Sequence, residues 1–197
     1  MKRIGLALMA TLILTCQVFS QIIHIPGDQP SIQAGIDAAV DGDTVLVADS
    51  TYFENINFNG KAITVTSHFL IDGDTSHISK TIINGSQPVH PDTASVVRMI
   101  SGEDSKSVLY GFKITGGTGM YMDASLCNIY PLSTIYILGG GIAIIDGGPT
   151  IKNNIITNNK IAHREGRVCV GGGISVIISR NDRSDEKTLL IENNIVS

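Results

Sequence analysis

Two stretches of the sequence gather side chains suited to contacts with sugars and acidic groups. Residues 118–138 hold three tyrosines, and residues 160–170 hold one histidine and two arginines. The six residues are Tyr121, Tyr130, Tyr136, His163, Arg164 and Arg167. Tyrosine rings stack on sugar rings, and guanidinium groups hold carboxylates or sulfates. If the two stretches lie side by side, they form a glycan-contact surface; the alternative is a hydrophobic flap that packs against the rest of the fold.

Two acidic turns place carboxylates at a spacing seen in calcium loops. Asp41-Gly42-Asp43 and Asp72-Gly73-Asp74 each carry two carboxylates two residues apart. Neither continues to the later acidic ligands that complete such a loop, and ordinary turns have the same composition. The five histidines show no zinc-ligand spacing: His24, His68, His77, His90 and His163. We therefore expect no metal and no cofactor.

The composition indicates that these residues are carried by β-strands. After Ser20 the chain has 28 Ile and 12 Val against 8 Leu, and β-branched side chains favour pleated structure. This bias excludes helical bundles and argues against an alternating βα enzyme. One helix is expected over about residues 31–40, with Ser31 as its N-cap. From Thr44 the apolar period changes to two, which is typical of strands.

Repeats indicate that the strands stack on one another. Ile114, Ile156 and Val196 recur in similar surroundings at separations of 42 and 40 residues, and the Gly-Gly-Gly-Ile element at 139–142 returns at 171–174. Such repeats, with loops of variable size, are typical of a solenoid. The sequence therefore predicts an all-β fold, a parallel β-helix. Residues 21–60 would form its N-terminal cap and first strands, and residues 61–197 its coils.

Paired asparagines recur at the repeat period, as Asn153 and Asn154 and again as Asn193 and Asn194. Asparagine tolerates a left-handed backbone, and its amide can bond to the equivalent residue of a neighbouring strand about 4.8 Å away. This recurrence predicts a structural asparagine ladder. The alternative is that these amides bind a ligand.

Several segments also carry a family resemblance. They are residues 31–47, 51–56, 80–85 and 107–115, together with the two Gly-Gly-Gly-Ile elements. These segments resemble secreted bacterial right-handed parallel β-helix proteins with the pectin-lyase-like fold, over nearly the whole mature chain. The resemblance implies a right-handed parallel β-helix with a short N-terminal capping helix. It implies no single activity, because that superfamily includes lyases, hydrolases, esterases and surface proteins without known chemistry.

The catalytic signatures of that superfamily's enzymes are missing. Residues 50–54 are similar to an early segment of pectin methylesterases, but the later catalytic segments are absent, as are the acidic cluster and arginine of pectate lyases. Asp146 has no second acid at repeat spacing to complete a hydrolase pair. Tyr52 and Glu54 are interpreted as strand-end packing and a solvated charge. No catalytic residue is assigned.

The favoured hypothesis is a secreted or cell-surface module, structural or glycan-binding, whose partner is an extracellular polysaccharide or another cell surface. The alternative is the N-terminal part of a polysaccharide lyase or glycoside hydrolase. In that case the catalytic coils would lie beyond Ser197. The last repeat stops in mid-coil without a cap, which predicts that the coils continue.

The N-terminus predicts that the protein is secreted, and secretion in turn bears on the state of its cysteines. Residues 1–20 have the layout of a secretory signal peptide, with an apolar run shorter than the roughly 20 residues that span a bilayer. Its removal takes two basic residues and leaves 12 basic and 18 acidic ones, a net charge of −6, which argues against nucleic-acid binding. Cys127 and Cys169 then lie at matched repeat positions, which predicts a disulfide. Two buried, unpaired cysteines satisfy the same spacing.

Overall fold

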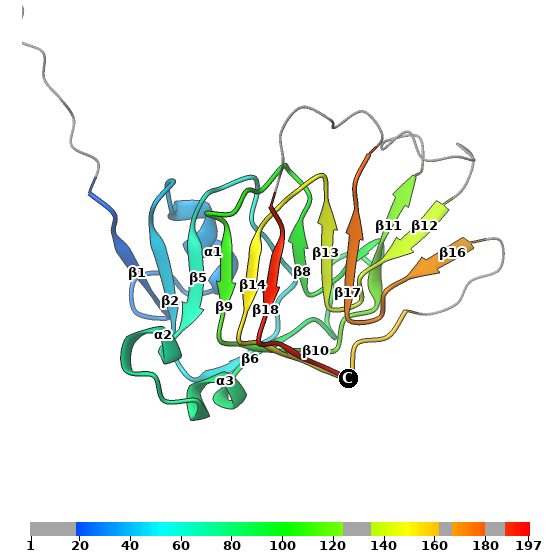
Figure 1. The fold of residues 1–197 in the computed structure, drawn as a ribbon. Helices are drawn as coiled ribbons and strands as arrows, with labels where there is room; N and C mark the ends of the chain where they lie inside the picture. The colour runs from blue at the N-terminus through cyan, green and yellow to red at the C-terminus, as the bar shows by residue number, and fades with distance from the viewer. Residues whose placement is uncertain (1–18, 124–134, 162–166, 180–187) are drawn as a thin grey trace, which may run out of the picture.

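The computed structural model of the protein describes residues 19–123, 135–161, 167–179 and 188–197. These residues form mostly β-strands, with three short helices (Figure 1), so the prediction of a β-rich fold is confirmed. No helix in these ranges is both long and apolar enough to cross a bilayer. The predicted signal peptide lies almost entirely outside the described residues.

Three of the four sheets are parallel throughout. Sheet A has six strands in the order β1 (Ile22–Ile25), β2 (Thr44–Val47), β5 (Thr64–Ser67), β9 (Val108–Tyr110), β14 (Thr150–Lys152) and β18 (Leu190–Glu192). Sheet B has the order β3 (Ser50–Tyr52), β6 (Thr81–Asn84), β10 (Lys113–Thr115), β15 (Ile155–Ile156) and β19 (Ile195–Val196). Sheet C has the order β4 (Ile56–Asn57), β8 (Val97–Met99), β13 (Ile142–Ile145) and β17 (Ile174–Ile177).

Sheet D is mixed and projects beside sheet C (Figure 1). Its order is β7 (Thr93–Ala94), β11 (Gly119–Asp123), β12 (Ile135–Leu138) and β16 (Arg167–Val170). β11 is antiparallel to both β7 and β12, while β12 and β16 are parallel. Residues 118–138, one of the two stretches singled out in the sequence, therefore contain an antiparallel pair of strands, and along β11 Met120 and Met122 alternate with Tyr121 and Asp123.

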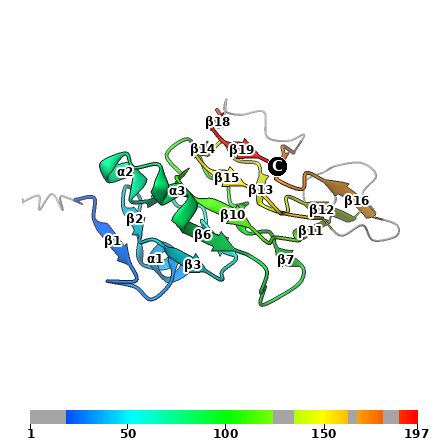
Figure 2. The same ribbon diagram turned by 90° about the horizontal axis from the view of Figure 1, so that it is seen from below.

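The repeats seen in the sequence lie side by side in the sheets. Ile114, Ile156 and Val196 occupy one row of sheet B, seen from below in Figure 2. Ile142 and Ile174, which end the two Gly-Gly-Gly-Ile elements, pair across sheet C. Residues 32 to 42 positions apart thus become neighbours, and loops of different lengths absorb the difference in spacing.

Inward-facing rows from sheets A, B and C share one hydrophobic core. In sheet A the row is Val45, Val65, Leu109 and Ile151, and all four side chains are fully buried. Isoleucines and valines of sheets B and C pack against this row. The many isoleucines and valines of the sequence therefore form a core of stacked side chains of similar size.

The predicted helix is present as α1 (Ile32–Ala38), two residues shorter at its C-terminal end than expected, with the Ser31 hydroxyl accepting the Ala34 N–H at 3.1 Å. Its first turn has a second cap that the sequence did not indicate. The Glu54 carboxylate accepts the N–H groups of Ile32 and Gln33 at 3.0 and 2.9 Å. The interpretation of Glu54 as a solvated charge is therefore wrong. Its carboxylate accepts hydrogen bonds from two N–H groups that have no partner within the helix.

Two further helices, α2 (Phe69–Asp72) and α3 (Ser76–Lys80), were not expected from the sequence. They follow β5 and precede β6, and they project from sheets A and B at one corner (Figures 1 and 2). Each is about one turn long, so neither shows the extended 3.6-residue periodicity by which helices are found in sequences.

Candidate functional site

The β11–β12 hairpin covers the outer face of sheet C with an apolar surface. Met120, Met122 and Leu138 form a buried cluster with Ala143 of β13. This packing against sheet C favours the hydrophobic-flap alternative for this face of sheet D. Because side chains alternate along a strand, residues 121, 137, 167 and 169 lie on the opposite face.

On that opposite face the structure brings Tyr121 and Arg167 together. The guanidinium carbon of Arg167 lies 4.3 Å from the centre of the Tyr121 ring, within cation–π range. Ile137, which is almost fully buried, pairs with Tyr121 and fills the space between β11 and β16. One guanidinium nitrogen of Arg167, Nη1, is buried and has no hydrogen-bond partner. The pair combines a fixed aromatic ring with a cation that has unused donors.

The structure separates Tyr136 from this pair. Tyr136 is partly buried and packs against the apolar cluster beneath the hairpin. Successive side chains of a strand point to opposite faces of the sheet. Tyr136 therefore faces sheet C, while its neighbour Ile137 faces away. Tyr130, His163 and Arg164 lie outside the described residues. Of the six residues predicted to form the glycan-contact surface, the structure therefore brings together Tyr121 and Arg167.

Cys169 is exposed on β16. Its neighbour on β12 is Ile137, whereas Cys127 lies outside the described residues. The repeat spacing that aligned the two cysteines is thus not the register of the sheet, since the hairpin adds residues between them. Their pairing stays a prediction.

The two members of each asparagine pair have different structural roles. Asn153 and Asn193 adopt positive φ angles of 56° and 54°, and Gly111 takes the corresponding left-handed position one turn earlier, with φ 81°. Asn154 is buried, and its N–H and its Nδ2 both donate to Asn194 Oδ1, at 2.9 and 3.1 Å. The predicted ladder between equivalent residues is present in this form.

A second asparagine position follows the same pattern. Asn159 Oδ1 accepts the Gly117 N–H at 2.9 Å, and its Nδ2 donates to the Ile114 carbonyl at 2.9 Å. All of these bonds run between stacked strands or their connecting corners. The amides are thus occupied by the backbone, which supports the structural interpretation over ligand binding.

The two acidic turns bind the backbone. Asp43 accepts the N–H groups of Gln21 and Val40, each at 2.8 Å. Asp72 and Asp74 accept the N–H groups of Asp74 and Ser76 at 2.8 and 2.9 Å. No group of three or more His, Cys, Asp or Glu side chains in the described part of the chain has metal-site geometry.

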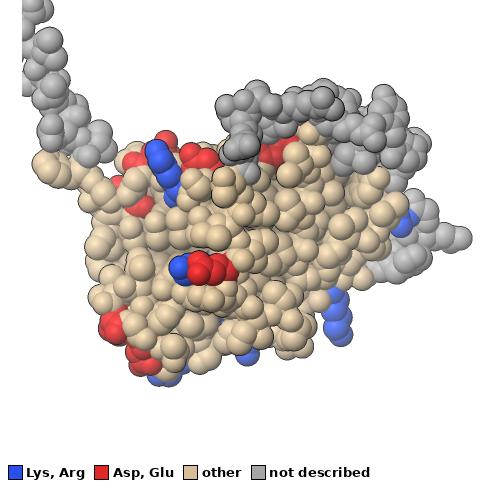
Figure 3. Space-filling model, in the orientation of Figure 1, with Lys and Arg blue, Asp and Glu red and all other residues tan. Residues whose placement is uncertain are grey.

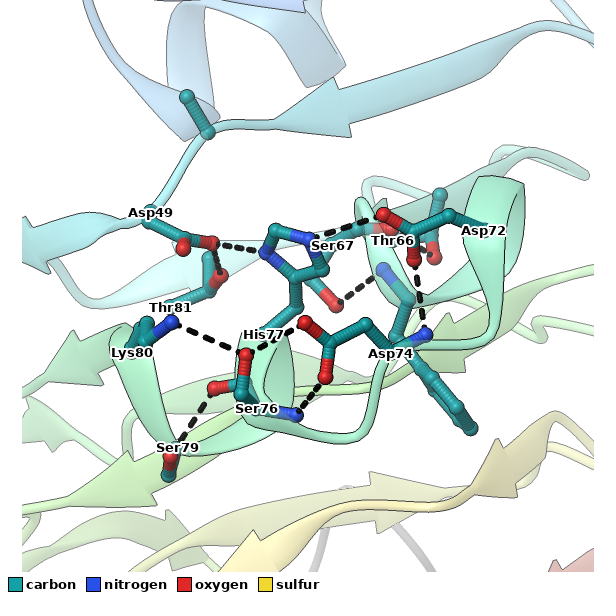
Figure 4. Close-up of polar contacts among 12 residues, drawn as sticks. Asp49, Thr66, Ser67, Asp72, Asp74, Ser76, His77, Ser79, Lys80 and Thr81 are labelled. Carbon is teal, nitrogen blue, oxygen red and sulfur yellow. Dashed lines mark hydrogen bonds and ion pairs between the residues drawn. The ribbon is translucent and has the colours of Figure 1, made fainter.

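A histidine cluster at the corner of α2 and α3 was missed in the sequence. His77 lies between two carboxylates (Figure 4): its Nδ1 is 2.6 Å from Asp49 Oδ1, and its Nε2 is 3.1 Å from Asp72 Oδ2. Asp49 also accepts the Thr81 hydroxyl at 3.1 Å. Asp49 precedes His77 by 28 residues, so no local spacing indicates the cluster.

This cluster does not have the arrangement of a hydrolytic triad. Both ring nitrogens of His77 are engaged by carboxylates, and the Ser76 hydroxyl donates to Asp74 at 2.8 Å and accepts from Lys80 at 3.0 Å. The histidine therefore does not activate the serine, which nucleophilic catalysis would require. The cluster instead joins the α2–α3 corner to Asp49, in the connection between β2 and β3.

We predict that His77 makes stability depend on pH. The Asp49 hydrogen bond, the largest cause, raises the pKa of His77 above 6.5, and that of Asp72 is lowered by the Asp74 N–H. Protonated His77 therefore stabilises the fold fully below about pH 6.5, and this contribution is lost as the pH rises through the raised pKa. The carboxylate contribution is lost in acid, as the pH falls through the lowered pKa of Asp72.

The measurement is chemical denaturation of wild type and His77→Gln between pH 4 and 9. The stability deficit of the variant should be largest between about pH 5 and 6.5 and should shrink at alkaline pH. His24→Gln, at an exposed position, is the control and should show no such trend. A His77→Gln deficit that is the same at pH 6 and pH 9 would contradict the assignment.

The comparisons with known proteins assign no family and no activity. No family model matches the chain, and no curated protein matches it either.

Proposed function

We propose that the parallel sheets are coils of a right-handed parallel β-helix and that the protein is a secreted relative of the pectin-lyase-like superfamily. The in-register rows of sheets A, B and C support the coil arrangement, since from β2 onward the chain visits the three sheets in the repeating order A, B, C. The Asn154–Asn194 bonds support it as well, because they join equivalent corners of neighbouring circuits. The N-terminal sequence supports secretion.

On this scaffold we propose binding of an extracellular polysaccharide that carries acidic groups. The single observation behind the proposal is the stacked pair of Tyr121 and Arg167 on the outer face of sheet D. A guanidinium is planar, so its N–H groups lie in one plane, which suits a carboxylate or sulfate, and tyrosine offers an apolar surface to a sugar ring. The broad face of sheet A, by contrast, shows few charges in Figure 3, apart from a small group near its centre.

We expect Arg167→Gln to weaken binding of an acidic polysaccharide about tenfold, because a charge-assisted hydrogen bond contributes roughly 1.5–3 kcal/mol. The measurement is calorimetric titration of the secreted chain with polygalacturonate, a sulfated glycan and a neutral glucan. Tyr121→Ala should weaken the same interaction, and neither variant should affect the neutral glucan.

Lys113→Gln is the matched control, since it removes an equal charge from β10 of sheet B. It should leave the affinity within about twofold at moderate salt. If Lys113→Gln and Arg167→Gln weaken binding equally, the interaction reflects net charge alone and the proposed surface is wrong.

A further inference from the structure

A cavity of about 280 Å³ lies beside β4 and β8, and neither Tyr121 nor Arg167 lines it. It is built on rigid elements: Arg98 is the central residue of β8, between the fully buried Val97 and Met99. Because side chains alternate, Arg98 points away from the core shared by sheets A, B and C. Gln33 of α1 forms part of the wall and is held by the backbone of Asn57, accepting its N–H at 2.7 Å and donating to its carbonyl at 3.1 Å.

Arg98 has no anionic partner among the described residues. Its Nε is buried without a hydrogen-bond partner, and burial lowers the pKa of its guanidinium from the usual value. Its neighbours in the row across sheet C are Asn57 and Ala143, which carry no charge. An arginine stays protonated at neutral pH even so. A buried donor without an acceptor destabilises the folded chain, and a bound anion would supply the missing acceptor.

Glu54, whose carboxylate also lines the cavity, is hydrogen-bonded to helix α1. Both oxygens of Glu54 accept N–H groups of α1, from Ile32 and Gln33. Its charge nevertheless lies in the cavity wall, and it opposes ligands that bring two or more negative charges. The site therefore favours a single negative charge placed against Arg98.

The remaining walls select the rest of the ligand. Phe53 is 52% exposed and Val89 is fully exposed, so both offer apolar surface to the cavity. Gln87 and Thr93 add neutral polar groups. A guanidinium accepts a planar carboxylate side-on through Nε and one terminal nitrogen, and a flat apolar body would lie against the phenyl ring.

From these observations we infer that the Arg98 cavity is a binding site for a small monocarboxylate with a flat apolar face. It is separate from the polysaccharide surface proposed above. The carboxylate pairs with the Nε edge of Arg98, and the body of the ligand contacts Phe53. No bond forms or breaks.

Sodium benzoate is the probe, with benzamide as its neutral counterpart of nearly the same shape and sodium sulfate as an anion without an apolar face. Calorimetry and ligand-observed NMR on the secreted chain should show saturable benzoate binding. Benzamide and sulfate should each bind at least about tenfold more weakly. Equal binding of benzoate and benzamide, or no benzoate binding, overturns the inference.

Variants assign the binding to the cavity. Arg98→Gln should weaken benzoate binding about tenfold, and Arg98→Lys should weaken it less, because a lysine restores the charge but not the planar fork. Phe53→Ala should weaken it about threefold and should leave stability intact, since Phe53 is exposed; it tests the site even if Arg98 variants unfold. Lys113→Gln should have no effect. Undiminished binding in both Arg98→Gln and Phe53→Ala overturns the inference.

A cross-test separates the two sites. Arg98→Gln should leave polysaccharide affinity unchanged, and Arg167→Gln should leave benzoate affinity unchanged. Failure of the polysaccharide experiment alone would leave the benzoate result standing. If Arg167→Gln abolishes benzoate binding while Arg98→Gln does not, the ligand is bound on sheet D and the inference is wrong.

Discussion

Replacing Asn154 by alanine should destabilise the protein by about 3 kcal/mol, because several buried backbone groups lose their partners at once. Asn154 Oδ1 accepts the Phe112 N–H at 2.9 Å, and its Nδ2 donates to the carbonyls of Leu109 and Lys152 at 3.1 and 3.0 Å. Asn154 is only 1% exposed, so water does not replace these bonds in the folded state.

Urea denaturation of the 197-residue chain measures this loss, provided that the slope of the unfolding free energy against urea concentration is unchanged. Asn194→Ala is the matched control. Its side chain donates in the same way, to the carbonyls of Ile151 and Glu192, but it is partly exposed, so we expect a loss of only about 1 kcal/mol. An Asn154→Ala loss no greater than that of Asn194→Ala would show that the ladder does not stabilise the fold as described.

Gly140→Ala should also cost about 3 kcal/mol, for a steric reason. A Cβ at Gly140 would lie 2.5 Å from the Gly172 carbonyl oxygen and 3.2 Å from the backbone nitrogen and oxygen of Lys160. These are backbone atoms of adjacent chain segments, so they move only if the parallel pairing of the Gly-Gly-Gly corners moves with them. The Gly141 N–H bond to the Gly172 carbonyl, at 3.0 Å, lies at this contact.

Gly172→Ala is the paired test, because it is the same position of the second Gly-Gly-Gly-Ile element. There a Cβ would meet only the Asn159 carbonyl oxygen at 3.4 Å, an ordinary contact. We expect a change within about 0.5 kcal/mol in the 197-residue chain. Neither glycine needs a left-handed backbone, so the pair isolates the effect of space. Similar losses in both variants would contradict the steric explanation.

The parts of the fold that the sequence predicted correctly rest on local patterns. The Ser31 cap and the apolar spacing that follows it located α1. The recurrence of Ile114, Ile156 and Val196 predicted a row that the structure shows in parallel register. Both patterns can be detected because a helix turn or a stacked repeat places similar residues at a constant separation.

The candidate sites were harder to predict, because they join residues with no constant separation. Glu54 caps a helix that begins 22 residues earlier, and Asp49 meets His77 over 28 residues. Arg98 offered no signal at all, since an arginine in a strand usually reaches solvent or a carboxylate. Only its place between Asn57 and Ala143, with Glu54 already occupied, leaves its Nε without a partner.

By itself, then, the sequence determined a β-rich chain with an early capped helix, stacked repeats and asparagine corners, since each of these follows from side-chain type and period along the chain. The tertiary structure decided which face of the inserted hairpin is buried, and so separated Tyr136 from Tyr121 and Arg167. The physical reason is the two-residue alternation of a strand: its phase is set by what packs against it, here Ala143 of sheet C, and not by the strand alone.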